Sequence, residues 1–190
     1  MGKTRLEAFS DGVIAILITI MVIELKVPHS VEPAALLELL PEFLSYVLSF
    51  IYLGIYWNNH HHMLHTVTKV RGGILWANMH LLFWLSLIPF TTGWLGENEF
   101  SALPVALYGA NLLLAAIAYF ILQTTIIRAQ GADSVLSKAI GNDWKGKASP
   151  VLYTLGLLLA FVAPVASCAI YVLVALIWLI PDQRIERILA

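Results

Sequence analysis

The stretch from Phe9 to Ile23 reads FSDGVIAILITIMVI, and its single charge, on Asp11, precedes an unbroken apolar run. A membrane-spanning helix needs about 20 largely apolar residues, so this stretch predicts a span. A carboxylate at the edge of a span is costly and persists only where a partner or a function stabilises it. The sequence therefore predicts an integral membrane protein in which Asp11 has a role.

The overall composition agrees with a membrane location. The 190 residues are 59% hydrophobic and 12% charged, whereas soluble domains average about 45–50% apolar and about 25% charged residues. This length predicts one domain, residues 1–190. The net charge of −1 gives no indication of a nucleic-acid partner, and the single cysteine, Cys168, excludes an intrachain disulfide.

Hydropathy predicts an all-α membrane protein with six transmembrane helices. The stretch 150–181 would be about 45 Å long as one helix, too long for one crossing. Small residues and Pro164 near its middle indicate a turn that splits it into two spans. The polar segment before it is expected to carry one short surface helix, around 134–140. The six predicted helices cover residues 6–26, 41–58, 73–94, 102–128, 150–162 and 165–181.

The basic residues predict the orientation. With the N-terminus in the cytoplasm, all of the 11 Lys and Arg residues except Lys26 fall in inside segments. Short cytoplasmic segments carry an excess of such residues. We therefore expect a multi-pass protein of the cell membrane with both termini in the cytoplasm.

One stripe of the first helix is a candidate functional surface. At 100° per residue, Ile16, Thr19, Ile20 and Ile23 share this stripe, and Asp11 points about 140° away from Ile16. An apolar stripe usually faces lipid or the core of the helix bundle, but an apolar constriction is also a gating device in pores. Periodicity alone leaves both interpretations open.

Further motifs appear in order along the chain. Arg5 precedes Phe9-Ser10-Asp11 by three intervening residues, Trp57-Asn58-Asn59-His60-His61 follows at the end of the second predicted helix, and Asn78 and Pro89-Phe90 lie in the third. This succession resembles the transmembrane protein 175 family, which comprises the lysosomal potassium channel and its bacterial homologues.

The resemblance implies a potassium-selective channel that conducts K⁺ passively and needs no cofactor. A chain of this length would assemble as a homotetramer in the bilayer, with four first helices lining a central pore. Ile16 corresponds to the narrowest point, Thr19 to a hydroxyl ring proposed to contribute to selectivity, and Ile20 and Ile23 to further pore positions.

The resemblance also implies a polar network that keeps the pore helices in register. The alternative is a charged trio solvated at the cytoplasmic helix end. The candidate members of the network are Arg5, Phe9, Ser10, Asp11, Trp57, His60, His61 and Asn78.

Two more polar features have open interpretations. Glu24, at the outer end of the first helix, is either part of a cation-concentrating ring in an outer vestibule or an ordinary solvated acid. Among the histidines at 60–62 and 65, only His61 and His65 share a helix face. Zinc usually takes three or four ligands, so we expect hydrogen bonding rather than a metal site.

The alternative function is a proton-coupled carrier or a proton-permeable membrane protein in which Asp11 titrates. Carriers typically bind their substrate at helices broken at the bilayer midplane, and the first span has no midplane Gly or Pro, which disfavours a carrier. No nucleophile–base pair or phosphate loop is evident, so an enzyme is not expected.

Overall fold

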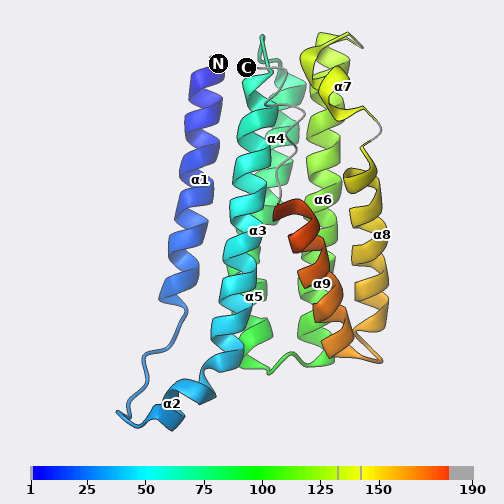
Figure 1. Ribbon diagram of the computed structural model, residues 1–190. Helices are drawn as coiled ribbons and strands as arrows, with labels where there is room; N and C mark the ends of the chain where they lie inside the picture. The colour runs from blue at the N-terminus through cyan, green and yellow to red at the C-terminus, as the bar shows by residue number, and fades with distance from the viewer. Residues whose placement is uncertain (1, 132, 142, 180–190) are drawn as a thin grey trace.

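The computed structural model describes residues 2–131, 133–141 and 143–179, and all regular secondary structure within these ranges is α-helical (Figure 1). Four apolar stretches are long enough to cross a bilayer, namely α1, α3, α4 together with α5, and α6. In chain order the helices are α1 (Lys3–Ile23), α2 (Pro33–Glu38), α3 (Leu40–His65), α4 (Gly72–Ser86), α5 (Ile88–Glu97), α6 (Ala102–Gln130), α7 (Val135–Ile140), α8 (Trp144–Leu159) and α9 (Pro164–Leu179).

The observed helix ends differ from the predicted ranges where polar residues continue a helix. Helix α3 ends at His65, well beyond the predicted end at residue 58, and α8 begins at Trp144 rather than at residue 150. Hydropathy marks only the apolar part of a span, whereas backbone hydrogen bonds continue into polar residues. Helix α1 ends at Ile23 instead of residue 26, and the short outer helix α2 was not predicted.

The third predicted span consists of two helices in one line. Leu87 separates α4 from α5 but keeps dihedral angles near the helical region, with φ −87° and ψ −9°. Pro89 lies in the first turn of α5. Because proline has no N–H, the carbonyl of Leu85 loses its usual donor four residues later, which accounts for the break.

Helices α8 and α9 form a hairpin. Helix α8 ends at Leu159 and Pro164 is the first residue of α9, so the break predicted within residues 150–181 falls between them. The residue before a proline is disfavoured in helical geometry, and proline is well tolerated in the first turn of a new helix. Residues 180 and 181, the end of the last predicted helix, lie outside the described residues.

A tyrosine cluster joins this hairpin to the long helices. Tyr52, Tyr108 and Tyr171 are each at most 1% exposed, and the Tyr52 hydroxyl donates to the backbone oxygen of Tyr171 at 2.6 Å. Two glycines let the Tyr171 ring approach closely. A Cβ on Gly109 would overlap the Tyr171 hydroxyl, and one on Gly156 would lie 2.5 Å from Tyr171 Cε1. These contacts fix α9 against α6 and α8.

Hydroxyl groups link α3, α5 and α6 inside the same core. The Thr92 hydroxyl donates to Ser49 Oγ at 2.6 Å, and Ser49 Oγ lies 2.9 Å from the Tyr108 hydroxyl. All three side chains are buried. Polar groups at membrane depth are costly without partners, so these bonds are what allow hydroxyls in the apolar core.

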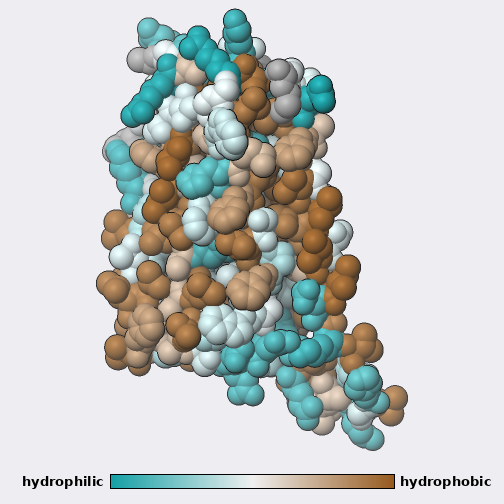
Figure 2. Space-filling view, turned by 180° about the vertical axis from the view of Figure 1, so that it is seen from behind, coloured by the Kyte–Doolittle hydropathy of each residue, from teal (hydrophilic) through white to brown (hydrophobic). Residues whose placement is uncertain are grey.

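Helix α1 lies at the edge of the bundle and packs mainly against α3, α4 and α5 (Figure 1). Polar side chains gather toward the two ends of the molecule, and mostly hydrophobic side chains cover the surface between them (Figure 2). Within the described ranges, one side of α1 is therefore largely left without a protein neighbour.

Candidate functional site

The uncovered side of α1 is the stripe singled out from the sequence. Ile16 is 58% exposed, Ile20 39% and Ile23 77%, and Thr19 is also exposed. The Thr19 hydroxyl donates to the backbone oxygen of Ile16 at 2.8 Å, which leaves its oxygen lone pairs outward. We call these four residues the α1 outer face. Among the described residues, this stripe is therefore largely unpacked within the subunit.

The opposite side of α1 packs into the subunit. Its buried residues recur three or four positions apart, the spacing of one helical face. At 100° per residue the middle of this buried face is about 120° from Ile16. These residues are Leu6, Ser10, Ile14, Leu17 and Met21.

A buried polar chain ties this packed side of α1 to α3 and α4. Asn78 Nδ2 donates to Ser10 Oγ at 2.9 Å, and His60 Nε2 lies 2.7 Å from Asn78 Oδ1. The Ser10 hydroxyl donates to the backbone oxygen of Leu6 at 2.9 Å. Ser10, His60 and Asn78 are each at most 1% exposed. We call these three residues the polar chain.

Asp11 has a separate partner. The indole Nε1 of Trp57 donates to Asp11 Oδ1 at 3.1 Å, in a partly exposed position. Consecutive helix residues diverge by about 100°, so Ser10 and Asp11 cannot face the same neighbours. The motif therefore contacts α3 and α4 through Ser10 and reaches Trp57 on α3 through Asp11.

Three of the predicted network members lie outside these bonds. Phe9 is 47% exposed. Arg5 is exposed, and its guanidinium has no hydrogen bond or ion pair within the described part of the chain. His61 is exposed and stacks on His65, with ring centroids 6.1 Å apart and planes at 26°. A single subunit thus brings together five of the eight residues, and the proposed roles of the other three stay predictions.

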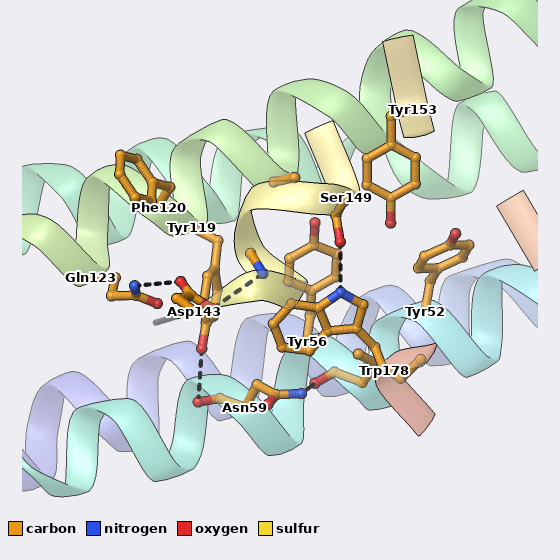
Figure 3. A pocket seen from close by; sticks show the side chains of 13 residues that line it. Tyr52, Tyr56, Asn59, Tyr119, Phe120, Gln123, Asp143, Ser149, Tyr153 and Trp178 are labelled. Carbon is orange, nitrogen blue, oxygen red and sulfur yellow. Dashed lines mark hydrogen bonds between the residues drawn. The ribbon is translucent and has the colours of Figure 1, made fainter. Parts of the chain in front are cut away.

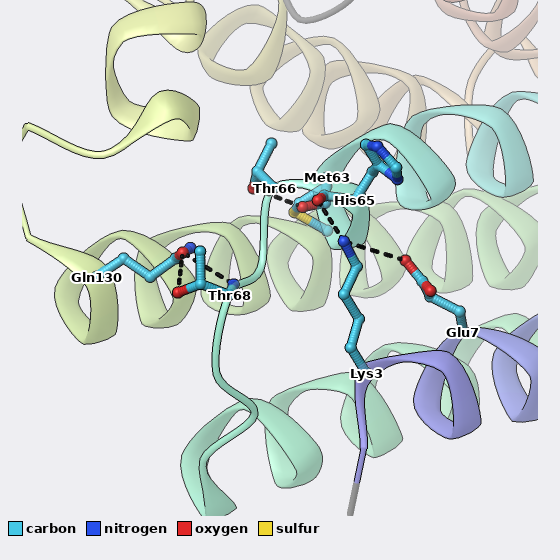
Figure 4. A network of polar contacts seen from close by, with 7 residues as sticks. All are labelled: Lys3, Glu7, Met63, His65, Thr66, Thr68 and Gln130. Carbon is cyan, nitrogen blue, oxygen red and sulfur yellow. Dashed lines mark hydrogen bonds and ion pairs between the residues drawn. The ribbon is translucent and has the colours of Figure 1, made fainter. Parts of the chain in front are cut away.

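A second tie between α1 and α3 was missed in the sequence analysis. Lys3 Nζ donates to the backbone oxygen of His65 at 2.5 Å, and it lies 3.8 Å from Glu7 Oε1 (Figure 4). The last carbonyls of a helix carry partial negative charge, so a lysine is favourable there. Nearby, Gln130 Oε1 accepts from the backbone N–H and the hydroxyl of Thr68, both at 3.2 Å. Such ties depend on where two helices end relative to each other, which the sequence does not indicate.

The histidines gather without forming a metal centre among the residues that the structure describes. No group of three His, Cys, Asp or Glu side chains there has the geometry to bind a metal ion. His60 belongs to the polar chain, and His61 makes ring contacts with Trp57 and His65.

The C-terminal end of α1 is acidic. Glu24 is exposed and lines a hollow together with Glu42 and Glu97. Lys26 Nζ lies 2.7 Å from Glu97 Oε1, and this hydrogen bond raises the pKa of Lys26. Glu42 Oε2 is buried and has no hydrogen-bond partner within the described residues. The described part of a single subunit thus presents three carboxylates and one lysine beside the C-terminal end of α1.

Comparison with known proteins identifies the family. Residues 5–89 match the family described as the endosomal/lysosomal potassium channel TMEM175. A potassium channel of Chryseobacterium sp. (strain P1-3) is 57% identical over 187 residues, which cover 98% of this chain and 97% of that protein. The human endosomal/lysosomal proton channel TMEM175 is 35% identical over 96 residues, which cover 44% of this chain and 19% of that protein.

A solved structure has the same fold over nearly the whole chain. The crystal structure of a lysosomal potassium-selective channel TMEM175 homolog from Chamaesiphon minutus matches with a TM-score of 0.83 and 28% sequence identity. The match covers 95% of this chain and 98% of that one. Because motif positions, close relatives and overall fold all agree, this chain belongs to the TMEM175 family.

Proposed function

We propose that this protein is a potassium-selective channel in which four copies surround a central pore lined by α1. The observation that carries the proposal is the α1 outer face, an apolar stripe with one hydroxyl that is uncovered in the subunit along a membrane-length helix. The relatives described as potassium channels support the choice of ion.

An exposed polar group on α4 supports assembly into an oligomer. His80 is exposed, and its Nε2 accepts a hydrogen bond from Trp84 Nε1 at 2.9 Å. It lies within the span that runs from α4 into α5. Histidine in contact with lipid at membrane depth is costly and usually faces protein or water. A neighbouring subunit on this side of α4 would remove that cost.

The proposed topology has six spans and cytoplasmic termini in the cell membrane. Helices α8 and α9 have 16 residues each, or about 24 Å, slightly less than the hydrocarbon thickness of about 30 Å. Local thinning of the bilayer and the flanking polar residues accommodate such a mismatch at modest cost. The basic residues of the inner segments support this orientation.

In this assembly Ile16 forms the narrowest ring and Thr19 follows one turn further out. A ring of four isoleucine side chains excludes water unless it widens, so it limits both leak and conductance. Ile20 and Ile23 continue the apolar lining, and Glu24 lies at the outer mouth, where four carboxylates would attract cations. The polar chain would fix the rotation of α1 about its axis, so that the outer face keeps pointing at the pore.

The test is an Ile16→Asn variant in liposomes. A polar ring would hydrate the constriction, and potassium flux should rise while the preference for potassium over sodium falls. Val22→Asn is the matched control, since Val22 is 49% exposed and points about 120° away from Ile16 on the same helix. Unchanged flux and selectivity in Ile16→Asn, with stable protein, would exclude Ile16 from the constriction.

Glu24→Gln tests the outer mouth. Removing four carboxylates should lower potassium flux at about 10 mM salt and have little effect at about 1 M, where the Debye length is only about 3 Å. A flux reduction that is equal at both salt concentrations would contradict an electrostatic role for Glu24.

Proton permeation through a pathway that includes Asp11 is the second candidate, because several vertebrate relatives are described as proton channels. Fluxes in liposomes separate the two functions. Potassium flux without a proton gradient that persists in Asp11→Asn supports the potassium channel. Saturable proton-coupled flux that disappears in Asp11→Asn supports the alternative.

A further inference from the structure

Three basic side chains lie where the beginning of α4 meets the end of α6, at the end of the molecule that we propose to be cytoplasmic. They are Lys69, Arg71 and Arg128, and we call them the basic patch. All three are exposed, and none of their charged groups has a hydrogen bond or an ion pair within the described part of the chain. The loop that carries Lys69 is fixed to α6, because the N–H and the hydroxyl of Thr68 donate to Gln130 Oε1, both at 3.2 Å.

The two arginines of the patch lie at the same depth. Helices α4 and α6 run in opposite directions (Figure 1), and a Cβ on Gly73 would lie 3.6 Å from Thr125 Cγ2. Arg71 precedes Gly73 by two residues, or about 3 Å along the helix axis, and Arg128 follows Thr125 by three, or about 4.5 Å. Packed helix axes are about 8–10 Å apart, so the two guanidinium groups can reach one phosphate between them.

The elements that carry the patch contribute no negative charge. The segments 66–96 and 101–131 contain no Asp or Glu. Just beyond them, Asp133 is exposed and lies 3.9 Å from Lys138 Nζ. The patch is therefore a local excess of three positive charges at the boundary between the apolar spans and the polar end of the molecule.

The carboxylate that α8 directs at α6 lies on the other side of that helix. Asp143 Oδ2 accepts a hydrogen bond from Gln123 Nε2 at 3.0 Å (Figure 3). Arg128 follows Gln123 by five residues and therefore points about 140° away from it around the helix. Arg128 instead lies within about 60° of the direction of Thr125, which faces α4. The patch thus opens on the seam between α4 and α6.

Apolar side chains continue this seam toward the middle of the bilayer. Trp76 is 79% exposed and Ile121 is 38% exposed. Trp76 lies within about 60° of the direction of Gly73, and Ile121 within about 40° of that of Thr125, so both border the seam about one turn below the arginines. The head of the seam is open, since no atom lies within 4 Å of the position of a Cβ on Gly72.

We propose that this seam binds an anionic phospholipid of the inner leaflet. The phosphate lies between Arg71 and Arg128, and one acyl chain runs past Trp76 and Ile121. Guanidinium groups bind phosphate oxygens in pairs of parallel hydrogen bonds. Basic clusters between transmembrane helices at the cytoplasmic side suit anionic headgroups, and tryptophan favours the same depth. One subunit supplies all of these groups, so the site does not depend on potassium conduction, and only the choice of leaflet rests on the proposed orientation.

The experiment measures quenching of Trp76 fluorescence by brominated lipids in vesicles of phosphatidylglycerol in an excess of phosphatidylcholine. Either lipid carries the bromine at the same overall composition, and subtraction of the Trp76→Phe signal isolates Trp76. We expect phosphatidylglycerol to be enriched about fivefold around Trp76 relative to the bulk at about 0.1 M salt, and clearly less at about 1 M. Quenching in proportion to the bulk composition would overturn the proposal. Weak quenching by both lipids would also overturn it, because a neighbouring subunit would then cover the seam.

Neutralising the patch locates the site. The patch variant combines Lys69→Gln, Arg71→Gln and Arg128→Gln, and the enrichment around Trp76 should fall to about onefold. Arg71→Lys together with Arg128→Lys keeps the positive charge and should retain part of the enrichment, because lysine binds phosphate as a point charge. Only protein from the monodisperse size-exclusion peak is reconstituted, so loss of folding is not read as loss of binding.

The matched control removes three charges from the same end of the molecule, outside the seam. It combines Lys138→Gln, Lys145→Gln and Lys147→Gln. Lys138 lies beside Asp133, and Lys145 Nζ lies 5.8 Å from the centre of the Trp178 ring. We expect this variant to keep the enrichment of the wild type. An equal loss in the patch variant and in the control would show a general attraction of the basic end for anionic lipid and would refute the site.

Discussion

The polar chain can be tested by replacing Asn78 with leucine, which is similar in volume but has no hydrogen-bonding groups. Asn78 is fully buried and makes two hydrogen bonds, to Ser10 at 2.9 Å and to His60 at 2.7 Å. In the variant Ser10 still donates to Leu6, so its hydroxyl loses only an acceptor role. His60, which is 1% exposed, loses its hydrogen bond to Asn78 altogether.

The expected loss of stability comes mainly from the His60 imidazole, which is left without its hydrogen-bond partner. Leaving one buried polar group unpaired costs about 1–3 kcal/mol, and hydrogen bonds inside membrane proteins average about 0.6 kcal/mol with a maximum of about 1.7. We therefore expect Asn78→Leu to destabilise the subunit by about 2 kcal/mol. For a chain of this size each kcal/mol lowers the melting temperature by about 2–4 °C, so the expected decrease is about 4–8 °C.

The assay is thermal unfolding of the purified protein in detergent, followed by the loss of the monodisperse peak on size exclusion. Asn98→Leu is the control, because Asn98 is exposed and bonds only to the backbone of its own helix. Ser10→Ala should cost less in the Asn78→Leu background than in the wild type, since the bond between the two residues is already absent. A melting temperature for Asn78→Leu equal to that of Asn98→Leu would refute the reasoning.

Two further changes test packing and assembly. Gly109→Ala should lower the melting temperature by several degrees, because the added Cβ would overlap the Tyr171 hydroxyl. Gly54→Ala is the control, since its added Cβ meets no atom within 4 Å and should not destabilise the protein. Equal melting temperatures for the two variants would show that the Tyr171 ring moves freely. Trp57→Phe removes the indole N–H that donates to Asp11. We therefore expect a smaller tetramer fraction by size exclusion with light scattering, and unchanged ion selectivity in the tetramers that still form. Altered selectivity with a full tetramer yield would instead indicate that Asp11 contacts the ion path.

The membrane class and the main helices were predictable because hydrophobic runs leave few alternatives. A stretch such as 102–128, with almost no charge, has to satisfy its backbone hydrogen bonds internally in a bilayer, so it forms a helix. The break before Pro164 was predictable because proline restricts the residue before it. The helical continuation of α3 to His65 was missed, since polar residues outside the hydrocarbon carry no hydropathy signal.

The sequence predicted only which face of the first helix carries the candidate site. The period of 3.6 residues placed Ile16 with Thr19, Ile20 and Ile23 and turned Asp11 away from them, and the structure shows that this stripe is uncovered. Which residues would contact Ser10 and Asp11 was suggested only by the family motifs. Of those motif residues, Trp57 and Asn78 bond to side chains of α1, and His60 is joined to α1 through Asn78.

Taken alone, the sequence determined that the chain belongs in a membrane and which side of α1 is apolar, because hydropathy and helical period are local properties. The orientation that its basic residues indicate stays a prediction. Only the tertiary structure decided that the Ser10 side of α1 packs on α3 and α4, that Tyr171 fits against two glycines, and that Gln123 on α6 bonds to Asp143 at the start of α8. These features depend on contacts between residues far apart in the chain, such as Ser10 with Asn78 and Gln123 with Asp143. Such contacts form only when helices pack at a given rotation and depth, which no local pattern specifies.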